Sequence, residues 1–146
     1  MHWHIFAIGK PKLGFARDGI EEYATRLRPL ASITVEYLKP AAGEEESAAL
    51  LRRSEGMYRV ALDERGTQFT SREFAAKVSQ WEQDRIKDIA LLIGGADGHS
   101  AALRAKADMN WALGKLTLQH ELALVVVMEQ IYRAYAIKAG LPYHRD

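Results

Sequence analysis

Residues 89–98 read Ile89-Ala-Leu-Leu-Ile93-Gly94-Gly-Ala-Asp-Gly98, an unbroken apolar run that passes directly into a glycine-rich loop. Five apolar residues without alternation predict a strand that is buried on both faces, as in a parallel sheet. Ser100 follows the loop and is placed to cap a short helix that runs to about Ala107. A buried strand, a tight loop and a helix together indicate one unit of an α/β fold.

The same alternation extends in both directions along the chain. Strands are predicted at 2–8, 32–38, 58–63 and 115–118, and helices at 14–28, 44–55, from the capping-box signature at 70–73 onward, and at 121–138. Residues 40–56 carry two runs of like charge, so we expect this segment to be exposed and mobile. We predict a single α/β domain over residues 1–146, with a mostly parallel sheet flanked by helices.

Composition narrows the class of protein. The 146 residues are 48% hydrophobic and 27% charged, which is ordinary for a globular chain. The net charge of +1 lacks the strong basic excess of many nucleic-acid binders. The absence of cysteine excludes disulfides, zinc–thiolate sites and thiol nucleophiles. We find no targeting segment, and the longest apolar run is too short for a membrane span, so we expect a cytoplasmic protein.

Three segments are expected to meet where ligands bind in open α/β sheets, outside the carboxyl ends of the strands. They are Leu62 to Gly66, Gly94 to Gly98 and Leu113 to Leu118. The glycine loop indicates either a close approach to a ligand or merely a tight turn. Dinucleotide, P-loop and serine-hydrolase motifs are missing. His2 and His4 share a strand face without a further ligand, so we predict no metal site.

The chain ends in Pro142-Tyr143-His144-Arg145, which places a phenol, an imidazole and a guanidinium beyond the last helix. Pattern alone favours a solvated terminus here. A functional tail is the alternative.

Three motifs and this tail resemble the RlmH family of ribosomal RNA large-subunit methyltransferases, within the SPOUT superfamily. They are 91–98 (LLIGGADG), 113–120 (LGKLTLQH), 129–135 (EQIYRAY) and 142–145 (PYHR), and the resemblance covers essentially the whole chain. It implies a C-terminal deep trefoil knot and a homodimer that binds S-adenosylmethionine in the knot. The implied reaction is N3 methylation of a pseudouridine in helix 69 of 23S rRNA, on the assembled ribosome.

The resemblance also implies site residues. The cofactor-binding positions are Leu62, Gly94, Leu113, Gly114, Lys115, Leu116, Thr117 and Leu118. The catalytic positions are Tyr143, His144 and Arg145. His144 would accept the N3 proton or organise a water that does, Arg145 would stabilise negative charge, and Tyr143 would stack on the base or position the tail. The family's arginine after the knot is replaced here by Leu124.

Other functions remain open at this point. A ribosome-binding factor could keep the fold without catalysis, and Leu124 is the feature that favours it. A methyltransferase could also act on transfer RNA. Within the ribosomal reaction, positioning of the substrates with bulk water as proton acceptor competes with a proton-transfer role for His144.

Overall fold

The computed structural model describes residues 1–145 and contains one five-stranded sheet in the order β2-β1-β4-β3-β5. Every neighbouring pair of strands is parallel. The strands are β1 (His2–Ile8), β2 (Ser32–Leu38), β3 (Tyr58–Gln68), β4 (Asp88–Ile93) and β5 (Met109–Ala112). The predicted α/β class with a parallel sheet is therefore confirmed.

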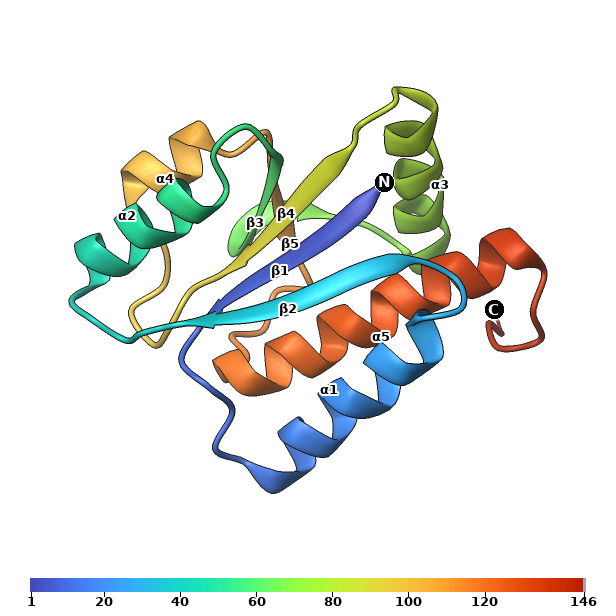
Figure 1. The fold of residues 1–146 in the computed structure, drawn as a ribbon, viewed down its shortest axis with the longest axis horizontal. Coiled ribbons are helices and arrows are strands. Elements are labelled where there is room, and N and C mark those ends of the chain that lie inside the picture. Colours follow the sequence, from blue (N-terminus) through green and yellow to red (C-terminus); the bar gives the residue numbers. More distant parts are fainter. Residues whose placement is uncertain (146) are drawn as a thin grey trace.

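Helices cover both faces of the sheet (Figure 1). One face carries α1 (Gly14–Leu27), α3 (Ser71–Gln83) and α5 (His120–Ala139), and the other carries α2 (Gly43–Arg53) and α4 (Ala101–Lys106). The alternation of β1 produces the two cores, because Trp3 and Ile5 face the first set of helices while Phe6 and Ile8 face the second.

Local sequence signals account for the helix ends. The Thr70 side chain accepts from the Glu73 backbone while the Glu73 carboxylate accepts from the Thr70 N–H, so the predicted capping box is confirmed. Ser100 likewise caps α4 through the Leu103 N–H. Gly140 ends α5 in the left-handed conformation, with a φ of 70°.

The prediction for the last strand is wrong. Residues 115–118 lie in the loop before α5, and the fifth strand is instead Met109–Ala112, which pairs with β3. Because it pairs with β5, β3 continues past Asp63 to Gln68. Gly66 permits this pairing, because a Cβ there would lie 2.5 Å from the Asn110 carbonyl carbon. Only glycine allows the two backbones to pass so closely.

The prediction that residues 40–56 are simply exposed is also wrong. Leu50 is fully buried in α2, and Ser47 and Glu46 are buried beside it. The Ser47 hydroxyl accepts from the Ser100 N–H, which ties α2 to the start of α4. Of the charged residues that suggested exposure, four are exposed, Glu44, Glu45, Arg52 and Arg53, whereas the Glu46 carboxylate is buried and accepts from the Ala41 N–H.

The strand order brings the C-terminal part of the chain back across the sheet. After β4, which lies between β1 and β3, the chain crosses to β5 at the far edge and returns through α5, which packs between α1 and α3. This path is consistent with the trefoil knot, which stays a prediction. Within residues 1–145, no helix is long and apolar enough to cross a bilayer.

Candidate functional site

A cavity of about 270 Å³ opens at the carboxyl end of β4, beside residues 62–65 of β3 and against the loop that precedes α5. It is lined by all three segments that the strand-end rule singled out. Seven predicted cofactor positions contribute to its wall: Leu62, Gly94, Leu113, Gly114, Leu116, Thr117 and Leu118. Lys115 is exposed and does not line the cavity. Leu116 stands at its wall with 78% of its surface exposed.

The two glycines of the predicted cofactor site play different structural roles. A Cβ at Gly94 would lie 3.2 Å from both the Gly98 carbonyl carbon and His99 Nδ1, so a side chain there would press on the loop's own packing. A Cβ at Gly114 would meet no described atom within 4 Å. Gly114 therefore borders open space at the cavity wall, and a side chain there would compete with a ligand without disturbing the fold.

A charged pair fixes the β3 side of the cavity. The buried Asp63 carboxylate accepts from the Arg65 backbone N–H at 2.9 Å and from the Arg65 guanidinium at 2.9 and 3.0 Å. Burial alone would raise the pKa of Asp63, but these hydrogen bonds outweigh burial and lower the pKa. Next to this pair, the Thr117 hydroxyl donates to Glu64 at 2.6 Å and so ties the loop before α5 to β3.

His99 also lines the cavity, and no role was predicted for it. Its Nε2 hydrogen bonds to the Leu92 carbonyl at 3.0 Å, whereas its Nδ1 is buried without a hydrogen-bond partner. Burial lowers the pKa of the imidazole, which keeps the ring neutral. The only signal in the sequence was the position of this histidine directly after the glycine loop.

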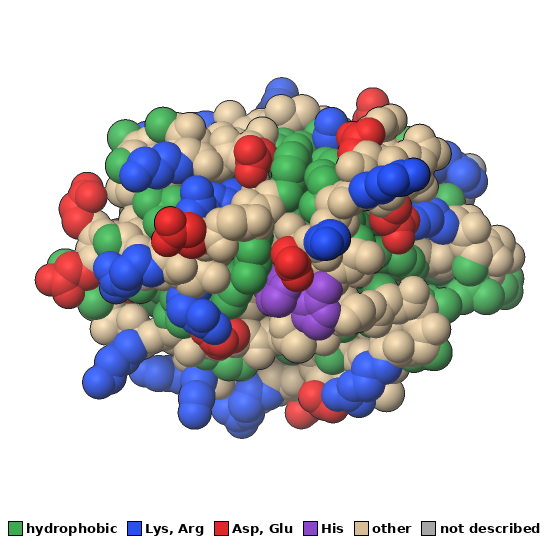
Figure 2. All heavy atoms as spheres, turned by 45° about the horizontal axis from the view of Figure 1, so that its top comes forward, with side chains coloured by type: hydrophobic (Ala, Val, Ile, Leu, Met, Phe, Trp, Pro, Cys, Tyr) green, Lys and Arg blue, Asp and Glu red, His purple; other side chains and the backbone are tan. Residues whose placement is uncertain are grey.

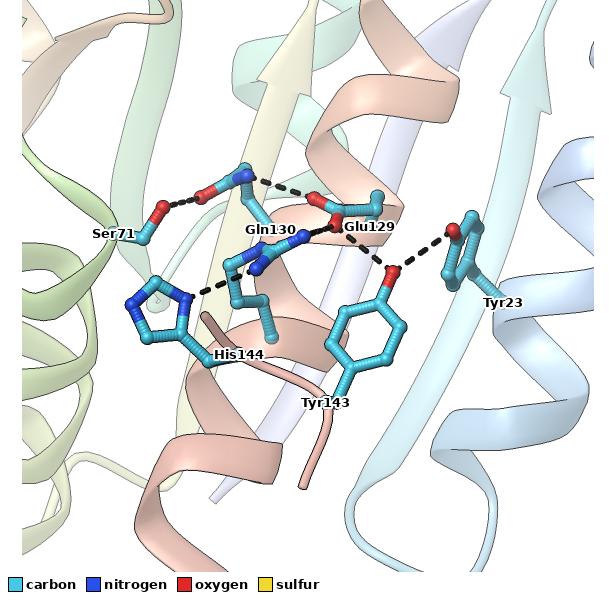
Figure 3. Close-up of polar contacts among 7 residues, drawn as sticks. Tyr23, Ser71, Glu129, Gln130, Tyr143 and His144 are labelled. Carbon is cyan, nitrogen blue, oxygen red and sulfur yellow. Dashed lines mark hydrogen bonds and ion pairs between the residues drawn. The ribbon is translucent and has the colours of Figure 1, made fainter. Parts of the chain in front are cut away.

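The predicted catalytic tail is docked on α5 (Figure 3). Tyr143 donates its hydroxyl hydrogen to Glu129 Oε1 at 3.0 Å and lies 3.1 Å from the Tyr23 hydroxyl. Burial, followed by the hydrogen bonds with Tyr23 and Glu129, raises the pKa of Tyr143, so the phenol stays protonated. The Arg133 guanidinium lies 4.8 Å from the Tyr143 ring centre. The reading of a solvated terminus is therefore wrong for Tyr143.

His144 is held by the same group of residues. The Arg133 guanidinium donates to His144 Nδ1 at 3.0 Å and also forms an ion pair with Glu129 at 2.5 Å. Because a guanidinium only donates, Nδ1 is the acceptor and the neutral ring carries its proton on Nε2. A proton-accepting role thus requires His144 to leave Arg133, while in the docked position its Nε2–H is a hydrogen-bond donor. Arg145 is exposed.

In one chain the cavity lies at the start of α5, whereas the tail folds back onto the second half of the helix. His120, the first residue of α5, lines the cavity, whereas the tail contacts Glu129 and Arg133. At 1.5 Å per residue, these positions are about 14 and 20 Å further along the helix. The structure therefore brings the cofactor residues together and the tail residues together, but not the two sets.

Leu124 occupies a core position. It is 2% exposed and packs from α5 into the core that this helix forms with the sheet. In this chain the side chain at the position of the family's arginine therefore serves packing and does not reach a surface where a phosphate could bind.

The predicted absence of a metal site rested on the histidine pair in β1. Figure 2 shows two adjacent histidine side chains surrounded by interspersed basic and acidic groups. The His2 and His4 rings lie 4.3 Å apart, with His4 Nε2 paired to Asp88 at 2.8 Å and His2 Nε2 hydrogen bonded to Thr34 at 3.1 Å. In the described part of the chain no three His, Cys, Asp or Glu side chains are grouped to hold a metal ion.

Comparison with known proteins gives a consistent result. The family model described as "Predicted SPOUT methyltransferase" matches residues 1–144. A protein of Thermus thermophilus named "Ribosomal RNA large subunit methyltransferase H" is 46% identical over 145 residues, covering 99% of both chains. One of the same name from Roseobacter denitrificans is 42% identical, covering 100% of both. Among solved structures, a probable methylase family protein of Haemophilus influenzae matches with a TM-score of 0.60 and 12% identity, covering 99% of this chain and 70% of that one.

Proposed function

Because the chain belongs to the SPOUT methyltransferase family, we propose that it methylates N3 of a pseudouridine in helix 69 of 23S rRNA, using S-adenosylmethionine on the assembled ribosome. The proposal rests chiefly on the cavity, which gathers seven of the cofactor-binding positions that the family resemblance implies. Full-length similarity to proteins named as large-subunit rRNA methyltransferases supports the ribosomal substrate. Such a substrate places the protein in the cytoplasm.

The cavity fits the proposed cofactor in shape and chemistry. Leu62, Leu116 and Leu118 provide apolar surface against which an adenine ring can pack. The open space at Gly114 leaves room for a ligand close to the backbone. When bound, S-adenosylmethionine supplies an electrophilic methyl group, and a direct displacement needs no nucleophile from the protein.

In this proposal the tail acts on the RNA base. Alignment of N3 with the methyl group supplies several kcal/mol of the barrier. The N3 proton must also leave, and His144, once released from Arg133, is the group that takes it up or orders a water that does. Arg145 is exposed and available to stabilise the charge that spreads to the base oxygens. Tyr143, protonated and docked, positions the tail.

The separation of cavity and tail supports a homodimer with shared sites. Helix α5 has 20 residues and is therefore about 30 Å long, while His144 is only five residues beyond its last residue, a reach of about 18 Å. The extended tail backbone therefore falls short of His120 at the start of α5, where the cavity of its own chain lies. Leu13 and Phe15 at the start of α1 are 39% and 58% exposed, and Leu122 and Val126 of α5 are half-buried nearby, which offers an apolar surface for a second copy.

A methylation assay with isotopically labelled S-adenosylmethionine tests the function. The substrates are 70S ribosomes, separated 50S subunits, protein-free 23S rRNA and bulk tRNA. We expect label only in the assembled ribosome, at one pseudouridine of helix 69 after nuclease digestion and mass spectrometry. Label in tRNA would replace the proposal with a tRNA methyltransferase. Ribosome binding without label would indicate a non-catalytic factor.

A further inference from the structure

The imidazole of His99 carries a buried acceptor that no residue of the described chain satisfies. Only 6% of its surface is exposed, and Nδ1 has no hydrogen-bond partner. The Leu92 carbonyl lies 3.0 Å from Nε2 and can only accept, so Nε2 carries the ring proton and Nδ1 presents a lone pair. A buried polar atom without a partner is costly, and such atoms in native proteins call for an explanation.

The surroundings of His99 fix the ring at the wall of the cavity, with the unpartnered Nδ1 next to Gly94. The Arg104 guanidinium donates to the His99 carbonyl at 2.8 Å, and the Ser100 N–H donates to Ser47, so both sides of the residue are anchored. A Cβ at position 94 would lie 3.2 Å from Nδ1, so with glycine there no side chain of residue 94 packs against Nδ1. His99 and Gly94 both line the cavity.

Burial keeps the His99 ring neutral, and the charged groups near it do not hydrogen bond to Nδ1. Asp63 of β3 favours protonation, whereas Arg104 of α4 and Arg65 of β3 oppose it. Burial is the largest effect and lowers the pKa of His99 below its ordinary value. The unprotonated Nδ1 of a neutral imidazole with a fixed tautomer accepts a hydrogen bond from a ligand donor and repels a ligand acceptor.

We propose that His99 Nδ1 accepts a hydrogen bond from an N–H or O–H donor of bound S-adenosylmethionine, either the adenine amino group or a ribose hydroxyl. This inference rests on the proposed function, since it places that cofactor in this cavity. His99 thereby adds a hydrogen-bond acceptor for the ligand to a wall that also contains leucines, glycines and charged side chains. It also assigns a role to a residue outside the motifs that carry the family resemblance.

Imidazole ¹⁵N NMR of protein labelled in its histidines tests the contact directly. On saturation with S-adenosylhomocysteine, the product that keeps adenine and ribose, the unprotonated Nδ1 resonance of His99 is expected to move upfield, as it does on accepting a hydrogen bond. The resonance is assigned from its loss in His99→Phe. Analogues that lack the 6-amino group, the 2′-hydroxyl or the 3′-hydroxyl identify the donor, because only the one missing it fails to shift the resonance. An unshifted resonance in saturated protein would overturn the inference.

Calorimetric affinities separate this inference from the proposed function. His99→Phe should weaken S-adenosylhomocysteine binding about three- to tenfold, the worth of one neutral hydrogen bond. His4→Phe makes the same chemical change in the amino-terminal half of β1 and should leave affinity unchanged. Gly114→Val should abolish binding. If Gly114→Val binds normally, the cofactor is not in this cavity and both ideas fail. If Gly114→Val loses binding while His99→Phe matches wild type, only the role of His99 fails.

Discussion

A mixed dimer of two inactive chains should regain activity. One chain carries Gly114→Val, which fills the cofactor cavity but keeps the tail. The other lacks residues 143–146, which removes the tail but keeps the cavity. The structure predicts that a tail works only on a partner's cavity, because about 18 Å of extended chain cannot span a helix of about 30 Å.

The expected magnitude follows from counting sites. Each variant homodimer should fall at least about a hundredfold, the usual worth of one acid–base group for the tail deletion. A heterodimer has two sites, of which one combines a damaged cavity with no tail and the other combines an intact cavity with an intact tail. Its activity should therefore be about half that of the wild-type dimer, and an unselected equal mixture should reach about a quarter.

The assay uses two affinity tags on co-expressed chains, so that tandem purification yields only heterodimers. Methyl transfer to 70S ribosomes is then measured with labelled S-adenosylmethionine. A doubly tagged wild-type dimer is the reference, and calorimetry verifies that the tailless chain still binds cofactor. Heterodimers that remain at the level of the two homodimers would refute the shared site, since a tail acting within its own chain can never rescue this pair.

Three further outcomes test the fold around the site. Gly66→Ala should destabilise the protein by roughly 1–3 kcal/mol or more, because its Cβ would lie 2.5 Å from the Asn110 carbonyl carbon, whereas Gly114→Ala should unfold at the wild-type temperature in a thermal scan. Tyr135→Phe should cost about 1–3 kcal/mol in urea unfolding, because it leaves the buried Trp3 N–H, now 2.9 Å from the Tyr135 hydroxyl, without an acceptor. Hydrogen bonds from the Leu13 and Lys12 backbone lower the pKa of Glu121, so its stabilising effect is present above about pH 4.3 and is lost as the pH falls through the lowered value. Glu121→Gln should flatten this acid limb of the unfolding temperature, and an unchanged limb would assign the acid sensitivity to other carboxylates.

The sequence predicts the elements whose signals are local. An all-apolar run specifies β4, and the capping box places the start of α3 at the correct residue. The strand-end rule also predicts where the cavity lies, because parallel strands place their carboxyl ends at one edge of the sheet. For β4 and α3 the cause lies within a few residues of the effect, and for the cavity it lies in the common direction of the strands.

Features that depend on distant partners were missed. Strand β5 has only four residues, and it forms because Gly66 lets β3 run on beside it. The segment 115–118 has a better strand composition but finds no neighbouring strand in the described structure. The acceptor on His99 could not be predicted either, because its isolation depends on Leu92 and Gly94 meeting around the ring.

The docked tail explains why Glu129 and Arg133 form a charged pair on α5, a mostly apolar helix. Glu129 and Arg133 lie one turn apart on α5, only 18% and 22% exposed, where burying charge is costly without firm partners. Tyr143 donates to Glu129, and Arg133 donates to His144. The pair therefore orders Tyr143 and His144 against α5 on folding, so the entropy of ordering Tyr143 is lost then and not on meeting RNA, while His144 is later released from Arg133. In the proposed dimer a tail ordered in this way is presented to the partner's cavity, since the cavity of its own chain lies at the start of α5, about 14 to 20 Å along the helix from Glu129 and Arg133.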